Sequence, residues 1–308
     1  MIEANSDAAS AAARVRAENL LDEPVWLQYA HFLGPFDLSP DGHVWFGGKG
    51  VRPWHGLLAL EFGREIQHSN VDVASEIGRR LLVTVPLSLA AIVLTYLVAV
   101  PLGVWCAARS GTRRERWVSM LLYLVHALPT FWLALVLILV FGATGLGWLP
   151  VIGLHGKDAD TLSAVARALD VIAHAVLPVL ALSLGGLAYL SRQVRGGVVA
   201  VLREDFMRTA RANGLSERDA LLRHGLKNAL LPVITLFGAV LPALVGGSIV
   251  VETVFGIEGV GRYAYEGLLQ RDTNIILAST VVSAVLTMLG ILFADVTYAI
   301  ADPRIRHG

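Results

Sequence analysis

The chain has 308 residues, of which 55% are hydrophobic and 16% charged, and its 25 basic and 25 acidic side chains cancel. A soluble domain usually carries about a quarter charged residues, so a mean hydropathy of +0.61 favours a membrane protein. The neutral balance gives no overall attraction to nucleic acid. The single cysteine, Cys106, excludes an internal disulfide framework and any multi-cysteine metal site.

Five apolar blocks follow an N-terminal region that we place at residues 1–76. Each is about 20 residues or longer, which is enough to cross roughly 30 Å of hydrocarbon as a helix. We therefore predict an all-α polytopic membrane protein, with kinks where Pro101 and Pro129 interrupt the helical hydrogen bonds. The predicted spans are Leu81–Ala108, Val118–Phe141, Val171–Leu190, Ala229–Val251 and Ile275–Ala294.

The loops between these blocks alternate in basic charge. Loop 109–117 holds four arginines and loop 191–228 holds eight basic residues, whereas loops 142–170 and 252–274 hold two each. Basic loops stay on the cytoplasmic side, so we place these two loops and the C-terminus, which carries Arg304 and Arg306, in the cytoplasm.

This orientation puts residues 1–76 outside the membrane. The first 80 residues contain neither a signal-peptide core nor an apolar run long enough to anchor them. We therefore expect a first span to be encoded upstream of Met1.

The second basic loop carries the signals of a helical hairpin. Apolar residues recur at helical spacing from Gly196 to Asn213, and Gly214 suits the left-handed residue that ends a helix. Ser216 is a good N-cap, and Asp219 three residues later fits a capping box in which each side chain binds the other residue's amide. The loop is predicted to form a helix, a sharp corner, a short helix and a return to the membrane near Leu230.

Two interpretations of this hairpin compete. In one, the arginines only set membrane topology. In the other, a rigid corner with apolar residues inserts into a groove on another protein, and the stop and cap signals favour this second interpretation. The apolar residues in question are Leu215, Ala220, Leu221 and Leu222.

The stretch "EDFMRTARANGLSERDALLRHGLKNALLPVI" (204–234) resembles the cytoplasmic signature loop of permease subunits of bacterial ABC importers, in the dipeptide and oligopeptide branch. The family's Glu-Ala-Ala core falls on Arg208, Thr209 and Ala210, so two of its three residues depart from the pattern, and its glycine falls on Gly214. "VVETVFGIEGVGR" (250–262) and "DPRIR" (302–306) are similar to the branch's last external loop and tail. The resemblance covers about residues 18–306, is weaker over Pro35–Trp54, and implies a preceding first helix that this chain lacks.

The resemblance implies a permease domain over 77–306 with a coupling loop at 192–228, in the bacterial inner membrane. It further implies a second permease subunit, two ABC ATPase subunits that use ATP and Mg²⁺, and an extracytoplasmic substrate-binding protein. The residues expected to couple to the ATPase are Arg208, Thr209, Ala210, Gly214, Leu215, Ser216, Glu217, Asp219 and Leu221.

The sequence predicts a transport subunit rather than an enzyme. "GGKG" (47–50) lacks the spacing and hydroxyl of a phosphate-binding loop, and no zinc-binding helix motif occurs, so neither a catalytic nor a metal site nor a bound cofactor is expected. His126, His174 and Asp295 are interpreted as structural polar groups. The substrate-binding residues cannot be identified from the sequence. A permease for nickel or another small solute, an ATP-independent transporter or channel, and an intramembrane enzyme remain alternatives, although no inverted repeat or paired catalytic groups support the last two.

Overall fold

The computed structural model describes residues 13, 16, 22–34, 36–37, 44–45, 56–68, 70–142, 144–230, 233 and 248–301. The chain divides into two compact units. One comprises residues 1–79 with 263–281, and the other comprises residues 80–262 with 282–308.

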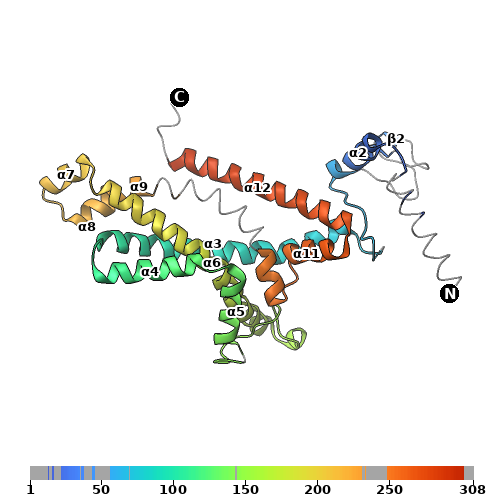
Figure 1. The fold of residues 1–308 in the computed structure, drawn as a ribbon, viewed down its shortest axis with the longest axis horizontal. Coiled ribbons are helices and arrows are strands. Elements are labelled where there is room, and N and C mark those ends of the chain that lie inside the picture. The colour runs from blue at the N-terminus through green and yellow to red at the C-terminus, as the bar shows by residue number, and fades with distance from the viewer. Residues whose placement is uncertain are drawn as a thin grey trace. The chain divides into compact units, whose positions relative to one another are not determined.

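Long helices dominate the described residues (Figure 1). α3, α6 and α12 are each long and apolar enough to cross a membrane, and α4 with α5 would make a fourth span if the pair crosses together. Most of the predicted span Ala229–Val251 lies outside the described residues, so the total of five stays a prediction. The bounds are α3 (Val73–Ala108), α4 (Arg113–Ala127), α5 (Thr130–Phe141), α6 (Ala164–Val201) and α12 (Thr273–Ala301).

The predicted span Val118–Phe141 is broken at Pro129. α4 and α5 meet at an angle of 108°, and Figure 1 shows α5 leaving the end of α4 steeply. Leu128 adopts an extended conformation with ψ 136°, because the ring of a following proline disfavours the helical conformation. The kink expected at Pro129 is present, whereas α3 runs without interruption past Pro86 and Pro101.

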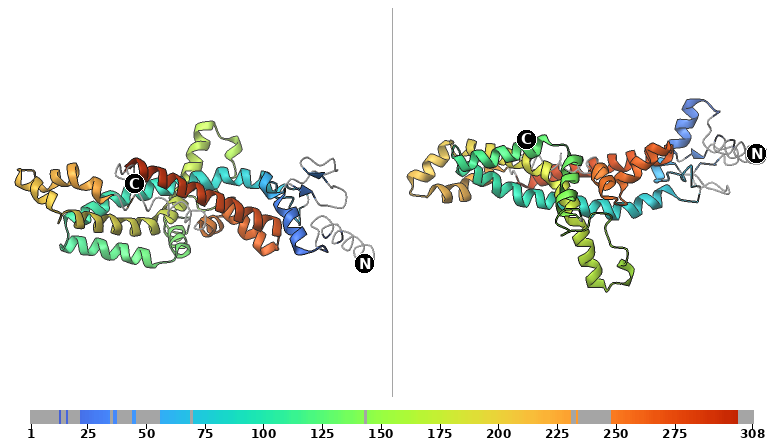
Figure 2. Two further views of the ribbon diagram at one scale, coloured as in Figure 1. Left: turned by 90° about the horizontal axis from the view of Figure 1, so that it is seen from above. Right: turned by 60° about the horizontal axis from the view of Figure 1, so that its bottom comes forward.

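α6 is the central helix of the second unit. Both α4 and α5 pack along it, and Figure 2 shows α4 beside α6. One apolar cluster joins Leu177 and Ala181 of α6 to Ala134 of α5, Leu87 of α3 and Phe255 of the helical residues 248–255. A second cluster lies at the other end of α6 and includes the hairpin that follows it.

The hairpin consists of four short helical pieces. α7 (Asp205–Ala212) is followed by α8 (Glu217–Ala220), a wide turn η3 (Leu221–Gly225) and α9 (Leu226–Ala229). In the wide turn the amide of Leu226 donates to the carbonyl of Leu221, one residue further than in an α-helix. Figure 1 shows α7 to α9 gathered at the end of α6.

The first unit contains small elements and the corner between two helices. Its elements are α2 (Val25–Leu33), the two-residue strands β1 (Phe36–Asp37) and β2 (Val44–Trp45), the turn η1 (Leu57–Ala59), and parts of α3, α12 and α11 (Val260–Gln270). β1 and β2 pair antiparallel, with Phe36 opposite Trp45. The all-α prediction did not include this short pair. The remaining turn, η2 (Ala159–Thr161), belongs to the second unit.

Candidate functional site

The corner of the hairpin is fixed by backbone hydrogen bonds around Gly214. The amide of Gly214 donates to Arg211 O (3.0 Å) and that of Leu215 to Ala210 O (3.3 Å). These two bonds form a Schellman motif, which satisfies the last carbonyls of α7. Gly214 has φ +87°, a conformation that side chains with a Cβ disfavour, so the predicted stop signal is confirmed.

The second half of the corner is a serine cap. Ser216 Oγ accepts from the amide of Asp219 at 3.1 Å, as the N-cap prediction required. The hydroxyl in turn donates to Asp219 Oδ2 at 2.6 Å. The carboxylate therefore binds the capping hydroxyl itself, rather than the Ser216 amide that the capping-box pattern had suggested, and it orients the serine oxygen toward the helix.

The inner face of the hairpin packs on α6. Met207 of α7, Ala220 of α8 and Leu221 of η3 are buried in one apolar cluster with Val194 and Val198 of α6. This corrects the expectation that Ala220 and Leu221 insert into a groove on another protein, because both are already covered by this chain. Their burial fixes the angle of the hairpin on α6.

Two glycines allow this close packing. A Cβ at Gly197 of α6 would lie 2.6 Å from the carbonyl oxygen of Ala229, the last residue of α9. A Cβ at Gly225 would lie 3.0 Å from Leu221 Cδ1 and 3.2 Å from Val201 Cγ1. The backbone of the returning segment thus runs directly against α6, at a distance that a larger residue prevents.

Arg211 is a structural residue of the hairpin that the sequence analysis did not single out. Its Nε donates to Met207 O (3.1 Å) and its Nη2 to Leu202 O (2.9 Å), the carbonyl that ends α6. One guanidinium thus binds the carbonyl that ends α6 and a carbonyl within α7, and so joins the two helices. Basic side chains commonly bind the free carbonyls at a helix end, and the position of Arg211 shortly after α6 was the available signal.

The outer face of the hairpin is polar. Arg208 pairs with Asp205 at 3.3 Å with both side chains exposed, and the Thr209 hydroxyl donates to Asp205 O at 3.1 Å. Leu215 and Ala210 are partly buried against the core, and Leu222 is 49% exposed. The predicted coupling residues therefore fall into an exposed set (Arg208, Thr209, Gly214, Ser216 and Asp219) and an inward set (Ala210, Leu215 and Leu221), while Glu217 lies in the first turn of α8.

The two basic loops are tied together beside α6. Arg195 of α6 places Nε 2.9 Å from Glu115 Oε1 and donates from Nη2 to Ser110 Oγ at 3.3 Å. Glu115 lies in loop 109–117, where hydrogen bonds from the hydroxyl of Ser119 and the amide of Gly111, together with the charge of Arg195, hold its pKa below the ordinary value. This contact fixes the start of α4 relative to α6.

The segment 250–262 is organised by a buried carboxylate. Glu252 is fully buried and accepts from the hydroxyl of Thr84 (2.7 Å) and the amide of Arg262 (2.8 Å). Thr84 also accepts from the amide of Val260, and a Cβ at Gly259 would overlap the carboxylate. The motif "VFGIEGVGR" therefore folds around Glu252, a role that the sequence alone did not indicate.

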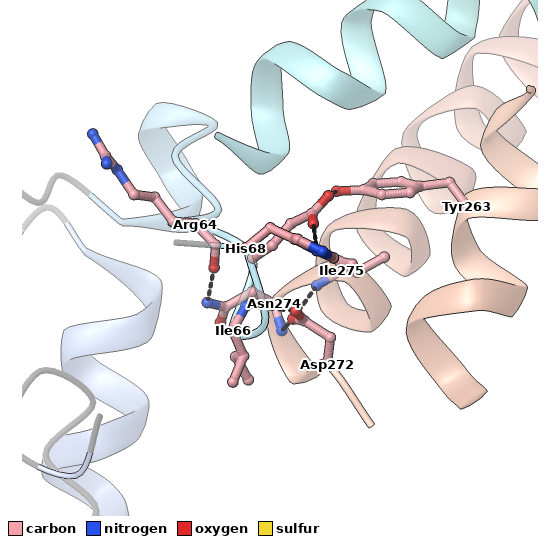
Figure 3. A network of polar contacts seen from close by, with 8 residues as sticks. Arg64, Ile66, His68, Tyr263, Asp272, Asn274 and Ile275 are labelled. Carbon is pink, nitrogen blue, oxygen red and sulfur yellow. Dashed lines mark hydrogen bonds and ion pairs between the residues drawn. The ribbon is translucent and has the colours of Figure 1, made fainter. Parts of the chain in front are cut away.

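A second carboxylate network lies in the first unit (Figure 3). Asp272, between α11 and α12, accepts from the amides of Ile66 (2.6 Å), Asn274 (3.1 Å) and Ile275 (3.2 Å) (Figure 3). Glu65 accepts from the hydroxyl of Tyr263 at 2.7 Å and contacts His68 at 3.0 Å. The Asn274 side chain donates to Arg64 O. These contacts fasten residues 64–66 to the corner between α11 and α12.

Residues 99–307 match the family model of the binding-protein-dependent transport system inner membrane component. The oligopeptide transport system permease protein AppB of Bacillus subtilis is 36% identical over 93% of this chain and 82% of its own length. The oligopeptide permease OppB of Mycobacterium tuberculosis H37Rv is 39% identical over 80% of this chain and 76% of its own length. The di/tripeptide permease DppB of Pseudomonas aeruginosa is 31% identical over 93% of this chain and 82% of its own length. An inward-facing structure of the MetNI methionine ABC transporter has a TM-score of 0.58 at 18% identity, covering 73% of this chain and 96% of that chain, and so shares the fold.

The long apolar helices and the capped hairpin on α6 define a multi-pass membrane permease. The chain belongs to the binding-protein-dependent transport system inner membrane component family. It is therefore the permease subunit of an ABC importer rather than an enzyme, which confirms the resemblance in the signature loop and disfavours an ATP-independent transporter. Among the residues that the structure describes, no group of three or more metal-ligating side chains occurs.

Proposed function

We propose that this permease imports oligopeptides and that the hairpin α7 to α9 transmits the movement of an ATPase subunit to the spans. The peptide substrate is supported by the names of its relatives, which are oligopeptide and di/tripeptide permeases. The coupling role is supported by the way the hairpin is built. Its corner is fixed at Gly214 and Ser216, its inner face is buried on α6, and its outer face is exposed.

The rigidity of this hairpin is the observation that carries the proposal. A segment that transmits force must not bend where it joins the span. Here the joint is held by the Schellman bonds of Gly214 and Leu215, by the Arg211 guanidinium across the end of α6, and by burial of Met207. The surface that contacts the ATPase is then the exposed set, which includes Arg208, together with Leu222. The inward set fixes the angle between the hairpin and α6.

The proposal includes a full assembly and an orientation. Two ABC ATPase subunits bind and hydrolyse ATP with Mg²⁺, a second permease subunit completes the pathway, and an extracytoplasmic binding protein delivers the substrate. Loops 109–117 and 191–228 and the C-terminus lie in the cytoplasm of a bacterial cell. Residues 1–76 lie outside, and residues 77–306 form the permease domain. The basic loops support this orientation.

Site-directed crosslinking tests the contact. Cysteine is introduced at Leu222, which is exposed on the hairpin, in the full transporter, and the chain's own Cys106, which is buried, is replaced by serine. We expect a short bifunctional reagent to join position 222 to the ATPase subunit, with a yield that changes when ATP is added. The matched control is cysteine at Leu169, which is exposed at the start of α6 in loop 142–170.

Position 169 should not react with the ATPase, and a membrane-impermeant thiol reagent should label it from the outside only. If position 222 is labelled from outside, or if both positions crosslink to the ATPase equally, the coupling proposal is wrong. Substrate is tested separately in proteoliposomes. Stimulation of ATP hydrolysis by the binding protein loaded with an oligopeptide, and not with nickel, is the expected result.

A further inference from the structure

A cavity of about 510 Å³ lies between α4 and α6, beside the basic loop 109–117. It is separate from the hairpin core, because α4 and residues 188–195 of α6 supply nearly all of its walls. Its charged residues are Arg116, Arg192, Arg195 and Glu115. Three guanidinium groups therefore face one carboxylate, and that carboxylate already has Arg195 2.9 Å away.

The remaining two arginines keep most of their hydrogen-bonding capacity among the described residues, since Arg116 donates from Nη2 to Gly111 O at 3.5 Å and its other N–H groups stay available. Among the described residues, neither Arg116 nor Arg192 has a carboxylate within ion-pair distance. Arg192 lies over the rings of Tyr123 (5.5 Å) and Tyr189 (5.9 Å), so the rings orient the guanidinium while its N–H groups in the plane remain available. Such a fork suits the oxygens of a phosphate.

A buried hydroxyl gives the second, independent sign of a ligand. Ser191 is 1% exposed and lines the cavity, and its Oγ has no hydrogen-bond partner among the described residues. Buried hydroxyl groups are generally paired, so an unpaired one at a cavity wall marks the place where a ligand oxygen is received.

The rest of the cavity is apolar and continues along the helices. Met120, Leu122 and Ala188 line it together with the arginines, and His126 also lines it. Arg116 and His126 are ten residues apart on one helix, or about 15 Å at 1.5 Å per residue. The cavity thus combines arginines along its length, from Arg116 to Arg192 over Tyr123, with apolar walls.

We propose that this cavity binds an anionic glycerophospholipid. The phosphodiester accepts hydrogen bonds from Arg116 and Arg192, the Ser191 hydroxyl binds a headgroup or ester oxygen, and an acyl chain lies along Met120 and Leu122. Basic pockets between spans at a membrane interface recognise anionic headgroups in this way. A lipid held here fixes α4 against α6, at the same end of α6 to which the hairpin is attached.

The test uses the assembled transporter purified in detergent and a photoactivatable phosphatidylglycerol. We expect crosslinked peptides to map to residues 116–126 and 188–195, with much less label from a matched phosphatidylethanolamine probe. Replacing Arg116 and Arg192 by glutamine should reduce the label at least about tenfold, because each basic residue near a lipid surface contributes a several-fold gain in affinity.

The matched control is the double substitution Arg113→Gln with Arg114→Gln. It removes the same amount of charge from positions on α4 that do not line the cavity. The control should label like the unchanged protein. Equal loss in both variants, crosslinks mapping elsewhere, equal labelling by both lipids, or displacement of the label by inorganic phosphate would each overturn the proposal. The mapping on the unchanged transporter needs no variant, so it decides the matter even if a substitution prevents assembly.

Discussion

The hairpin on α6 and the corner between α11 and α12 are stabilised by different kinds of interaction. Both hold a turn between helices in a fixed geometry. The hairpin does so with backbone caps and apolar packing, and its charged residues remain exposed. The corner does so with buried carboxylates, since Asp272 and Glu65 accept hydrogen bonds from residues that are about 200 positions away in the sequence.

The two turns should therefore respond differently to substitution. When one carboxylate accepts hydrogen bonds from several amides, its loss leaves all of these amides without an acceptor at once. A capped and packed hairpin distributes its stability over many small contributions, each of about 1 kcal/mol. Substitutions at the corner should therefore cost more than those at the hairpin, although the hairpin is the part expected to govern transport.

The largest effect is expected for Asp272→Ala. The substitution removes the acceptor of three amides, including that of Ile275, which is buried, and should cost about 3 kcal/mol or more of local stability. Hydrogen exchange at the amides of Ile66 and Asn274 measures this loss directly. The control is Asp160→Ala, whose carboxylate is 92% exposed and should change little. Equal exchange in the two variants would contradict the role of Asp272.

The second largest effect is expected for Gly197→Ala. Its Cβ would meet the Ala229 carbonyl, and such overpacking should destabilise the joint between α6 and α9 by about 1–3 kcal/mol. The neighbouring Gly196→Ala has open space around its Cβ and should stabilise α6 by about 0.5–1 kcal/mol, because alanine is the better helix former. Thermal inactivation of the transporter, compared between the two variants, checks the prediction. The same response in both would refute the close contact.

A smaller effect is expected for Gly214→Ala. No atom lies within 4 Å of the added Cβ, so the cost is the left-handed backbone alone, about 1–2 kcal/mol. Gly214→Asn should recover part of it, since asparagine tolerates this conformation. Substrate-stimulated ATP hydrolysis should fall in the alanine variant and return with asparagine, and failure of asparagine to help would point to a direct contact instead.

The smallest effect is expected for Ser216→Ala, at about 0.5–2 kcal/mol of α8 stability. The amide of Asp219 loses its acceptor, which should speed its hydrogen exchange. Transport should decrease more than membrane insertion, and Ser216→Asn, which keeps a capping oxygen, should restore it. An equal decrease of insertion and transport would remove the argument for a rigid hairpin.

The sequence indicated the elements whose causes are local. The stop at Gly214, the cap at Ser216 and the break before Pro129 each depend on residues within a few positions, so their signals survive without the fold. The apolar blocks likewise predicted α3, α6 and α12, because span length and hydropathy are properties of a continuous stretch.

Contacts between residues far apart in the sequence became visible only in the tertiary structure. The sequence shows that Leu221 and Ala220 are apolar, but only the folded cluster that they form with Val194 and Val198 shows that they are buried within this chain. Glu252 and Asp272 look like ordinary acidic loop residues, and their burial follows from donors brought to them by folding. The pairing of Arg195 with Glu115 has the same origin, since opposite charges 80 positions apart attract only after α4 and α6 have packed.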